Sequence, residues 1–315
     1  MEVTTQPKNQ KSEGFPMVEQ LIAIFCDVDD FCIEYERYSK THLLMDEKHI
    51  VNGSRMKMSE IMTIAIYFHL SCYRTFKWYY QKCISGNMRE YFPKLVSYNR
   101  FVELMQMVAA PLTLYMMKHS LGKCSGISFL DSTPIDVCDN RRIHSHRVFE
   151  NLAKRGKSST GWFFGFKLHI IINDRGEIIA FCITPGNVDD RDWDTISKLT
   201  AEVFGKLFAD KGYISAPLFS KLWDRGVQLV TKLRNNMKNK LMDMTDKLLL
   251  RKRAVIEAVN DFLKNICQIE HSRHRSVKNF FVNLISGLIA YSFIPKKPSL
   301  HIVYDVFSSL NNFSV

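Results

Sequence analysis

The fold is decided by the sequence ISFLDSTPIDV at residues 127–137, an apolar and β-branched run that predicts a strand. Two further strands are predicted close by, from Trp162 to Ile172 and from Glu177 to Thr184. The turn residues at 173–176 join these two strands through a short connection, as in a hairpin. We therefore expect a meander of three antiparallel strands.

Helices and strands alternate in the stretch after the meander. In order, we predict a helix from Asp192 to Phe204, a strand from Lys206 to Ala209, a helix from Ala216 to Asp224 and a strand from Val227 to Leu233. Strands separated by helices favour a sheet that is covered on both faces. The expected fold class is α/β, with a mixed sheet flanked by helices.

Residues 15–120 are predicted to be mainly helical. Ser59 begins a run of apolar residues at helical spacing, and Ser97 is placed to cap another helix. A helix from Tyr73 to Cys83 makes a helix-turn-helix possible, although ordinary helix packing fits the same pattern. The expected organisation is a helical region at 1–120, an α/β domain at 121–297 and a tail at 298–315.

Composition excludes several classes of protein. The 315 residues are 46% hydrophobic, which excludes a disordered chain, and no apolar stretch approaches the roughly 20 residues that span a bilayer. Residues 1–14 are polar and lack a secretory signal, so we expect an intracellular protein without a membrane segment. Eight irregularly spaced cysteines favour reduced thiols, and Cys138, His144 and His146 match no compact zinc module.

Positive charge is concentrated near the C-terminus. Residues 230–297 hold 14 Lys and Arg against five Asp and Glu, a surplus of +9 within a whole-chain charge of +11. A solvated basic face would explain such a run, but this concentration favours a surface that neutralises phosphates.

Three acidic residues lie among apolar neighbours. Asp131 lies in a strand that should be buried, and Asp210 ends the strand Leu207 to Ala209. Glu257 lies on a helix predicted from Leu250 to Ile266, where it shares a face with Arg253 and Lys264. A helix ion pair between Arg253 and Glu257 would be an ordinary structural feature. Three carboxylates on separate elements are also the oxygen ligands that two Mg²⁺ ions need for phosphoryl transfer.

These residues resemble the motifs of one known family, the DDE transposases of bacterial insertion sequences. Residues 130–133 are similar to its first-acid strand, residues 208–213 to its second-acid motif, and Arg253-x3-Glu257-x6-Lys264 to its third-acid signature. Residues 165–169 and 184–190 resemble its two segments between the first acids. The separations of the acids also fit, at 210 − 131 = 79 and 257 − 210 = 47 residues. Leu250 and Asp189 depart from the commonest pattern.

The resemblance implies an RNase H-like catalytic domain in which Asp131, Asp210 and Glu257 hold two Mg²⁺ or Mn²⁺ ions. It implies a transposase that nicks the ends of its element and joins the 3′-hydroxyl ends to target DNA, without a covalent protein intermediate. The expected partners are double-stranded DNA, both inverted repeats and target, and a second copy in a homodimer in the cytoplasm, at the nucleoid. The residues expected to contact DNA are Arg253, Lys264, Lys167, His169, Arg234 and Lys238.

Other functions remain open at this stage. A metal-dependent nuclease on the same scaffold needs the same three acids, and a transposase-derived DNA-binding protein could have lost catalysis. His169 could equally be a core histidine. A small-molecule hydrolase fits worst, because the sequence has no G-x-S-x-G motif and no nucleotide-binding loop.

Overall fold

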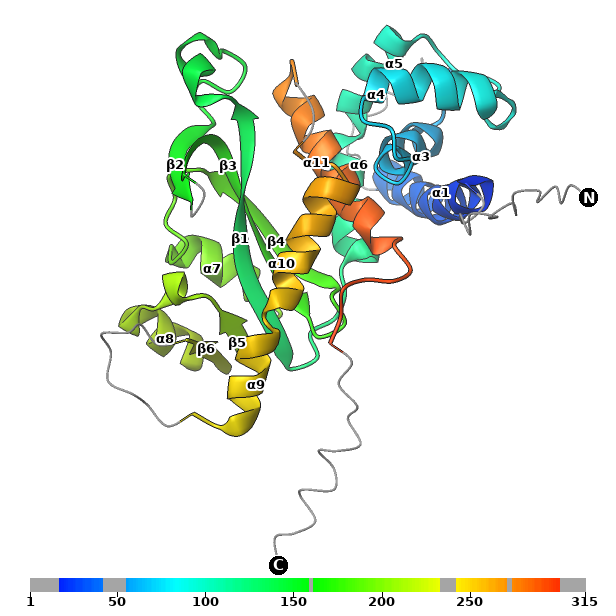
Figure 1. Cartoon of the computed structure of the whole chain (residues 1–315). Helices are drawn as coiled ribbons and strands as arrows, with labels where there is room; N and C mark the ends of the chain where they lie inside the picture. Colours follow the sequence, from blue (N-terminus) through cyan, green and yellow to red (C-terminus); the bar gives the residue numbers. More distant parts are fainter. Residues whose placement is uncertain (1–16, 42–54, 159–160, 233–241, 271–273, 301–315) are drawn as a thin grey trace, which may run out of the picture.

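A computed structural model describes residues 17–41, 55–158, 161–232, 242–270 and 274–300. Its centre is a six-stranded mixed sheet (Figure 1). The strands are β1 (Ile127–Cys138), β2 (Lys154–Ser158), β3 (Gly161–Asn173), β4 (Ile178–Pro185), β5 (Gly205–Ala209) and β6 (Val227–Thr231). Their order is β2-β3-β1-β5-β6, and β4 also pairs with β3.

The directions of the strands confirm the predicted mixed sheet. β3 is antiparallel to β1, β2 and β4, whereas β5 is parallel to both β1 and β6. The meander predicted from the sequence is thus β1-β3-β4. Strand β2 is a correction to the prediction, because its sequence KRGKS carries no apolar pattern and becomes a strand by pairing with Gly161 to Gly165.

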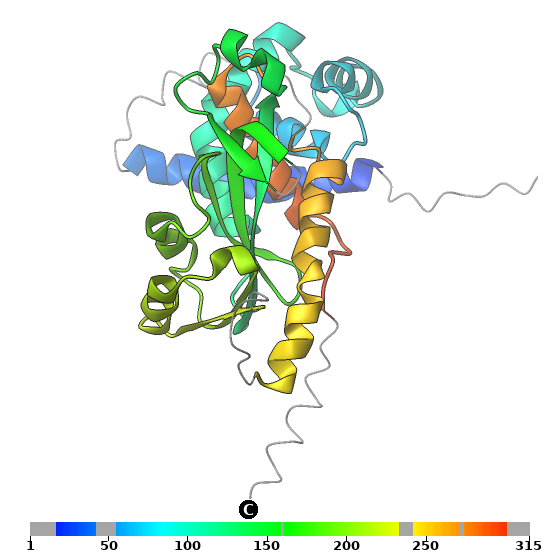
Figure 2. The ribbon, with the colours of Figure 1, turned by 60° about the vertical axis from the view of Figure 1, so that its left-hand side comes forward.

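Helices cover both faces of the sheet, as predicted. On one face, α7 (Trp193–Leu199) and α8 (Ala216–Trp223) close an apolar cluster that includes Leu130, Ile171 and Leu207. On the other face lie α9 (Met244–Lys252), α10 (Ala254–Asp261) and the π-helical turn η8 (Phe262–Ile266). Figure 2 shows α9 and α10 as one long arm beside the sheet.

Several helix boundaries differ from the prediction. The helix expected from Tyr73 to Cys83 is observed as α4 (Phe76–Trp78) followed by the π-helical η2 (Tyr79–Asn87). Helix α7 ends at Leu199 rather than at Phe204, and Asp192 caps its start by accepting a hydrogen bond from the backbone N–H of Thr195. The helix predicted from Leu250 begins earlier, at Met244, and is interrupted at Arg253 between α9 and α10.

The N-terminal region is helical where it is described. It comprises α1 (Met17–Thr41), α3 (Met58–Phe68), α4 (Phe76–Trp78), η2 (Tyr79–Asn87), η3 (Arg89–Tyr91), α5 (Tyr98–Met105), η4 (Gln106–Val108), α6 (Ala109–Tyr115) and η5 (Met116–Ser120). Ser97 caps α5 by accepting a hydrogen bond from the backbone N–H of Arg100, as predicted. Ten of the 11 residues of α3 are buried, so α3 is a core helix rather than the amphipathic one expected.

Helix α11 (Val277–Ser292) explains the burial of α3, because it packs against α3 and α6 although it follows the sheet in sequence. One apolar cluster contains Ile64 of α3, Leu288 of α11 and Ile170 of β3. The N-terminal helices and the sheet therefore share a core. Within the described residues, no helix combines the length and apolar character needed to cross a membrane.

Candidate active site

The first two acids are brought together by the parallel pairing of β1 and β5. Phe129 pairs with Phe208, an offset of 208 − 129 = 79 residues, and Asp131 and Asp210 are separated by the same 79 residues. Each acid therefore lies two positions beyond a paired phenylalanine. Since side chains alternate along a strand, both acids occupy the face of Phe129 and Phe208, whose cluster includes Val259 of α10.

The third acid joins them from α10, which packs on β1. Arg253 Nη2 donates to Glu257 Oε1 at 2.7 Å, and Arg253 Nη1 lies 3.7 Å from Asp131 Oδ1. Asn260, one turn after Glu257, donates through Nδ2 to Asp131 Oδ2 at 3.1 Å. A guanidinium group thus bridges the first and third acids, and an amide orients the first.

The three acids differ in exposure. The Glu257 side chain is 59% exposed, whereas that of Asp131 is 21% exposed. Asp210 is exposed and accepts a hydrogen bond from the backbone N–H of Lys211 at 2.6 Å. Two carboxylates therefore face solvent, and the third lies beneath them.

Burial raises the pKa of the Asp131 carboxyl to about 6. The Arg253 guanidinium opposes this rise, while the negative charges of Asp210 and Glu257 add to it. One Arg beside three carboxylates leaves a charge of −2 when all three are ionised. The arrangement therefore lacks positive charge, and a bound divalent cation would supply it.

Mg²⁺ and Mn²⁺ fit the chemistry of this group, because all the donors are carboxylate oxygens. As they stand, however, no three Asp, Glu, His or Cys side chains among the described residues are grouped closely enough to hold a metal ion. Arg253 occupies the space between Asp131 and Glu257. Asp131, Asp210 and Glu257 are called the acidic triad. For the triad to bind a metal ion, Glu257 would have to leave its ion pair with Arg253 and become a ligand of the metal.

Lys264 lies on the same arm but is engaged elsewhere. Its Nζ is 3.1 Å from Glu270 Oε2, and Glu270 Oε1 accepts a hydrogen bond from the backbone N–H of Asp136. Lys264 is therefore connected to β1 through Glu270.

Lys167 and His169 lie on the opposite face of the sheet from the acids. His169 pairs with Ser132, the neighbour of Asp131, so its side chain points to the α7 side. His169 is fully buried, its Nε2 lies 2.9 Å from Thr184 Oγ1, and burial lowers its pKa to about 4. The expected DNA contact of His169 is wrong for this structure, and the alternative of a core histidine is correct.

Lys167 also has internal partners. Its Nζ donates to the Val188 carbonyl at 2.8 Å and to Asp190 Oδ1 at 3.0 Å, and its side chain is 12% exposed. Ser132 Oγ donates to the same Asp190 oxygen at 2.9 Å. The expected DNA contact of Lys167 is therefore not supported. Arg234 and Lys238 lie outside the described residues.

Sequence reasoning missed Asn260, and treated Ser132 and Asp190 only as parts of motifs. Asn260 could have been found, because it is a polar residue on a buried helix face three positions after Glu257. The link from Ser132 to Asp190 depends on strand pairing that no local pattern reveals.

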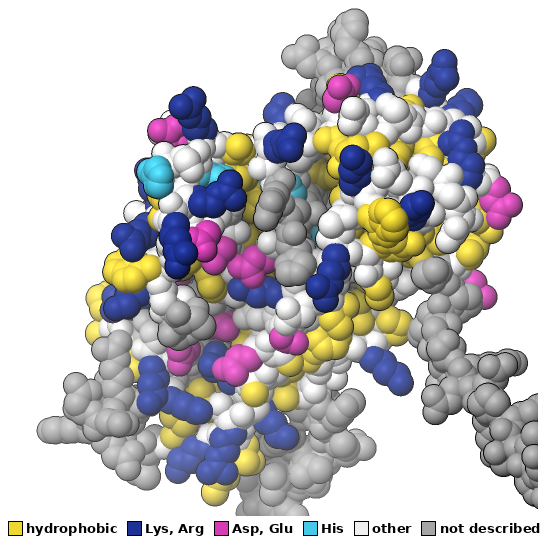
Figure 3. Space-filling view, turned by 45° about the horizontal axis from the view of Figure 1, so that its top comes forward, with side chains coloured by type: hydrophobic (Ala, Val, Ile, Leu, Met, Phe, Trp, Pro, Cys, Tyr) yellow, Lys and Arg dark blue, Asp and Glu magenta, His cyan; other side chains and the backbone are white. Residues whose placement is uncertain are grey.

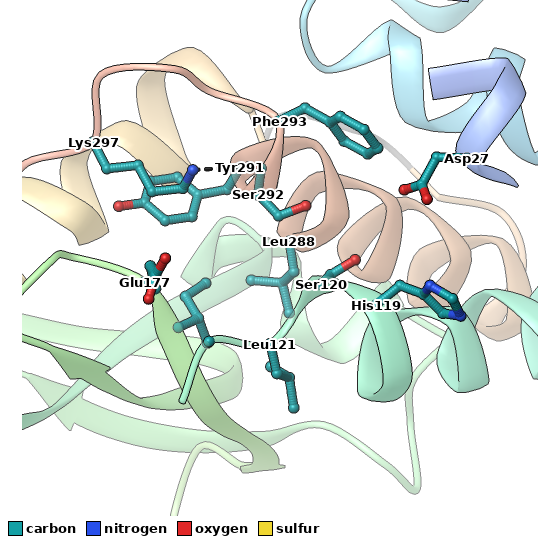
Figure 4. A pocket seen from close by; sticks show the side chains of 12 residues that line it. Asp27, His119, Ser120, Leu121, Glu177, Leu288, Tyr291, Ser292, Phe293 and Lys297 are labelled. Carbon is teal, nitrogen blue, oxygen red and sulfur yellow. Dashed lines mark hydrogen bonds between the residues drawn. The ribbon is translucent and has the colours of Figure 1, made fainter. Parts of the chain in front are cut away.

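A second polar site, a cavity of about 250 Å³, lies between η5, β4 and α11 (Figure 4). Asp27 and Glu177 lie at opposite ends of the group of side chains that line it. Lys297 Nζ donates to the carbonyl oxygens of Ser292 and Ile294 and thereby closes the end of α11. The charged side chains that line this cavity do not point toward one another, so the acidic triad remains the candidate active site.

One face of the molecule carries side chains of both charges. Figure 3 shows Asp and Glu side chains gathered in the middle of one face, with Lys and Arg side chains around them. Basic groups around an acidic centre suit a phosphate-bearing ligand that must approach carboxylates.

Comparison with known proteins adds one match. A family model described as the transposase DDE domain matches residues 121–277. This range starts where η5 ends, contains the whole sheet with Asp131, Asp210 and Glu257, and stops at the first residue of α11. A search of curated protein sequences found no match.

Proposed function

The chain belongs to the DDE-type transposases, and from this premise we propose that it nicks the ends of its own insertion sequence and joins the freed 3′-hydroxyl ends to target DNA. The observation that supports the proposal is that Asp131, Asp210 and Glu257 lie close enough together for the charges of Asp210 and Glu257 to raise the pKa of Asp131. Within the described residues, Arg253 is the cation shared by the ion pairs of Asp131 and Glu257. This group of carboxylates favours a site that binds a cation and, with it, a phosphate group of the substrate.

The DDE family implies use of a divalent metal. Asp131, Asp210 and Glu257 would hold two Mg²⁺ or Mn²⁺ ions, which when bound activate the attacking oxygen and stabilise the leaving oxygen. Asn260 would keep the Asp131 carboxylate oriented toward that site. Arg253, once released from Glu257, would be free to donate to a phosphate oxygen of the DNA backbone.

The partner would be double-stranded DNA in two forms, the inverted repeats and the target. The surplus of +9 in residues 230–297 supports this proposal, because neutralised phosphates drive non-specific DNA affinity. Arg234, Lys238 and Lys264 remain proposed DNA contacts. We further propose a homodimer acting at the nucleoid, because two element ends must be joined, with the helical region at 1–120 reading the repeats.

A strand-transfer assay tests the function. It combines the full chain, a labelled duplex ending in the DNA that flanks its own gene, a plasmid target, and either Mg²⁺ or EDTA. The proposal expects joined product with Mg²⁺ and none with EDTA or with Glu257→Gln. Glu202→Gln, the same change at an exposed carboxylate after α7, is the matched control and should leave joining unchanged.

Two outcomes would contradict the proposal. Cleavage without joining would indicate a metal-dependent nuclease on the same scaffold. DNA binding with neither cleavage nor joining would indicate a DNA-binding protein that has lost catalysis.

A further inference from the structure

An exposed tryptophan stands at the start of β3, far from the core that buries most of this strand. Trp162 is 54% exposed, and its cross-strand partner on β2 is Lys157. The Arg155 guanidinium carbon lies 4.8 Å from the centroid of the Trp162 ring, and Lys157 Nζ lies 5.8 Å from it. Two cations therefore contact one solvent-exposed indole.

These cations are available to a ligand. Among the described residues, neither Arg155 nor Lys157 forms an ion pair with a carboxylate. Their neighbourhood is also basic, since residues 139–158 hold six Lys and Arg against two Asp and Glu. The Asn140 amide donates to the Trp162 carbonyl at 2.6 Å, which brings the exposed Arg141 and Arg142 close to this site.

The backbone fixes which way these side chains point. Gly156, between Arg155 and Lys157, packs so closely that an added Cβ would lie 2.2 Å from the Gly186 carbonyl oxygen and 2.6 Å from the Phe163 ring. This side of β2 is therefore closed. Arg155 and Lys157, at the alternate positions, are directed to the side of Trp162.

We propose that Trp162, Arg155 and Lys157 form a platform on which an unpaired base of the DNA substrate stacks. The inference rests on the proposed function and deepens it by naming a feature of the DNA that the enzyme selects. An exposed aromatic ring binds a base face regardless of sequence, and adjacent cations neutralise the flanking phosphates. A duplex that is fully paired offers no free base face to the ring.

The position of the platform relates it to the triad. Trp162 and Ile170 occupy the same set of alternate positions on β3, and Ile170 pairs with Asp131. Eight residues of strand at about 3.3 Å each give about 26 Å between them. This distance equals the length of about seven or eight base pairs of duplex at about 3.4 Å each.

Fluorescence anisotropy with the full chain in EDTA tests the platform without any chemistry. The probes are a labelled duplex of arbitrary sequence and the same duplex with two unpaired bases at its centre. We expect the wild type to bind the second probe about tenfold more tightly, as stacking of one base supplies. Trp162→Ala should lose this preference with unchanged affinity for the paired probe, while Trp162→Phe should keep most of it.

A second tryptophan provides the matched control. Trp223 is 67% exposed on α8, and within the described residues no cation contacts its ring. Trp223→Ala should keep the preference for unpaired bases. Arg155→Gln and Lys157→Gln should each weaken the binding of both probes. Each should also lower the slope of log affinity against log salt concentration by about one.

Equal binding of the two probes by the wild type would overturn the inference, as would a Trp162→Ala protein that keeps the preference. A circular dichroism melt matching the wild type establishes that the variant is folded, and Trp162→Phe supplies the second variant if it is not. The readout is independent of catalysis. Failure of strand transfer with the preference intact would contradict only the proposed function.

Discussion

Two polar clusters lie back to back on β1 and β3, one on each face of the sheet. The open cluster is Asp131, Asp210, Glu257 and Arg253, beside α10; the closed cluster is Lys167, His169 and Asp190, beside α7. The closed cluster has no net charge. The charges of Lys167 and Asp190 cancel, and the lowered pKa of His169 keeps this histidine neutral. The open cluster has three carboxylates and one guanidinium.

This difference separates structural from chemical roles. In the closed cluster, Asp190 accepts from both Lys167 and Ser132, and His169 Nε2 lies beside Thr184, although His169 Nδ1 has no hydrogen-bond partner among the described residues. The closed cluster stabilises the fold and offers little to a ligand. The open cluster retains a charge of −2 and an Arg253 Nη1 without a hydrogen-bond partner, so its members have unused capacity for binding.

The largest expected effect is loss of activity in the open cluster. Asp210→Asn should reduce DNA cleavage by more than about 100-fold, because even outer partners of metal ligands cost up to that factor. Asp210 is exposed and caps only a single turn, so the free energy of unfolding should change by less than about 0.5 kcal/mol. Cleavage rates and urea unfolding check both parts. Asp224→Asn, at the exposed end of α8, is the control, and an active Asp210→Asn protein would refute the site.

The next effect is loss of stability in the closed cluster. Lys167→Met should lower the free energy of unfolding by about 2 kcal/mol, because the half-buried Asp190 carboxylate loses its cation. Urea denaturation measures this, with Lys118→Met on the exposed side of η5 as control. Adding Asp190→Asn should restore part of the loss. An unchanged Lys167→Met protein would show that the cluster is not structural.

An opposite sign is expected for the buried acid of the open cluster. Asp131→Asn should raise the free energy of unfolding of the metal-free protein by about 1–2 kcal/mol at pH 8, because burial disfavours the charged carboxylate. Mn²⁺ should raise the melting temperature of the wild type and not of the variant. Thermal melts with and without Mn²⁺ check this. A destabilised Asp131→Asn protein would mean that the Arg253 interaction outweighs burial.

The smallest effect is the pH dependence of the closed cluster. The pKa of His169 is about 4 in the folded chain, below its usual value of 6.5, so protonation favours the unfolded state. Its contribution to stability is complete above pH 6.5 and is lost as the pH falls toward 4. His169→Gln should reduce the loss of stability between pH 7 and 5 by about 1 kcal/mol. An identical pH profile for the variant would contradict this. The variant should still lose some stability as the pH falls, because the pKa values of His69 and His274 are also lowered to about 4.

The sequence predicted the open cluster better than the closed one. Asp131 and Asp210 stand out because an acid beside an apolar strand is costly, and the parallel β1–β5 pairing brings them together. The face on which Lys167 and His169 lie depends on the register of β1 with β3, which no local pattern contains. Spacing alone could not distinguish a buried network from a DNA contact.

The fold was predictable where local pattern and tertiary structure agree. Strands β1, β3 and β4 carry apolar, β-branched runs, and Ser97 and Asp192 are ordinary cap residues. Strand β2 is charged and exists through pairing with β3. The burial of α3 could not be foreseen, because it depends on α11 returning to the N-terminal helices.

A crystal structure of the full chain grown with Mn²⁺, with anomalous data collected for the metal, would locate any metal ion bound at the three acids. We expect an anomalous peak in contact with Asp131, Asp210 and Glu257, and an Arg253 guanidinium that no longer donates to Glu257. A map without a peak at these carboxylates, and with the ion pair between Arg253 and Glu257 intact, would contradict this expectation.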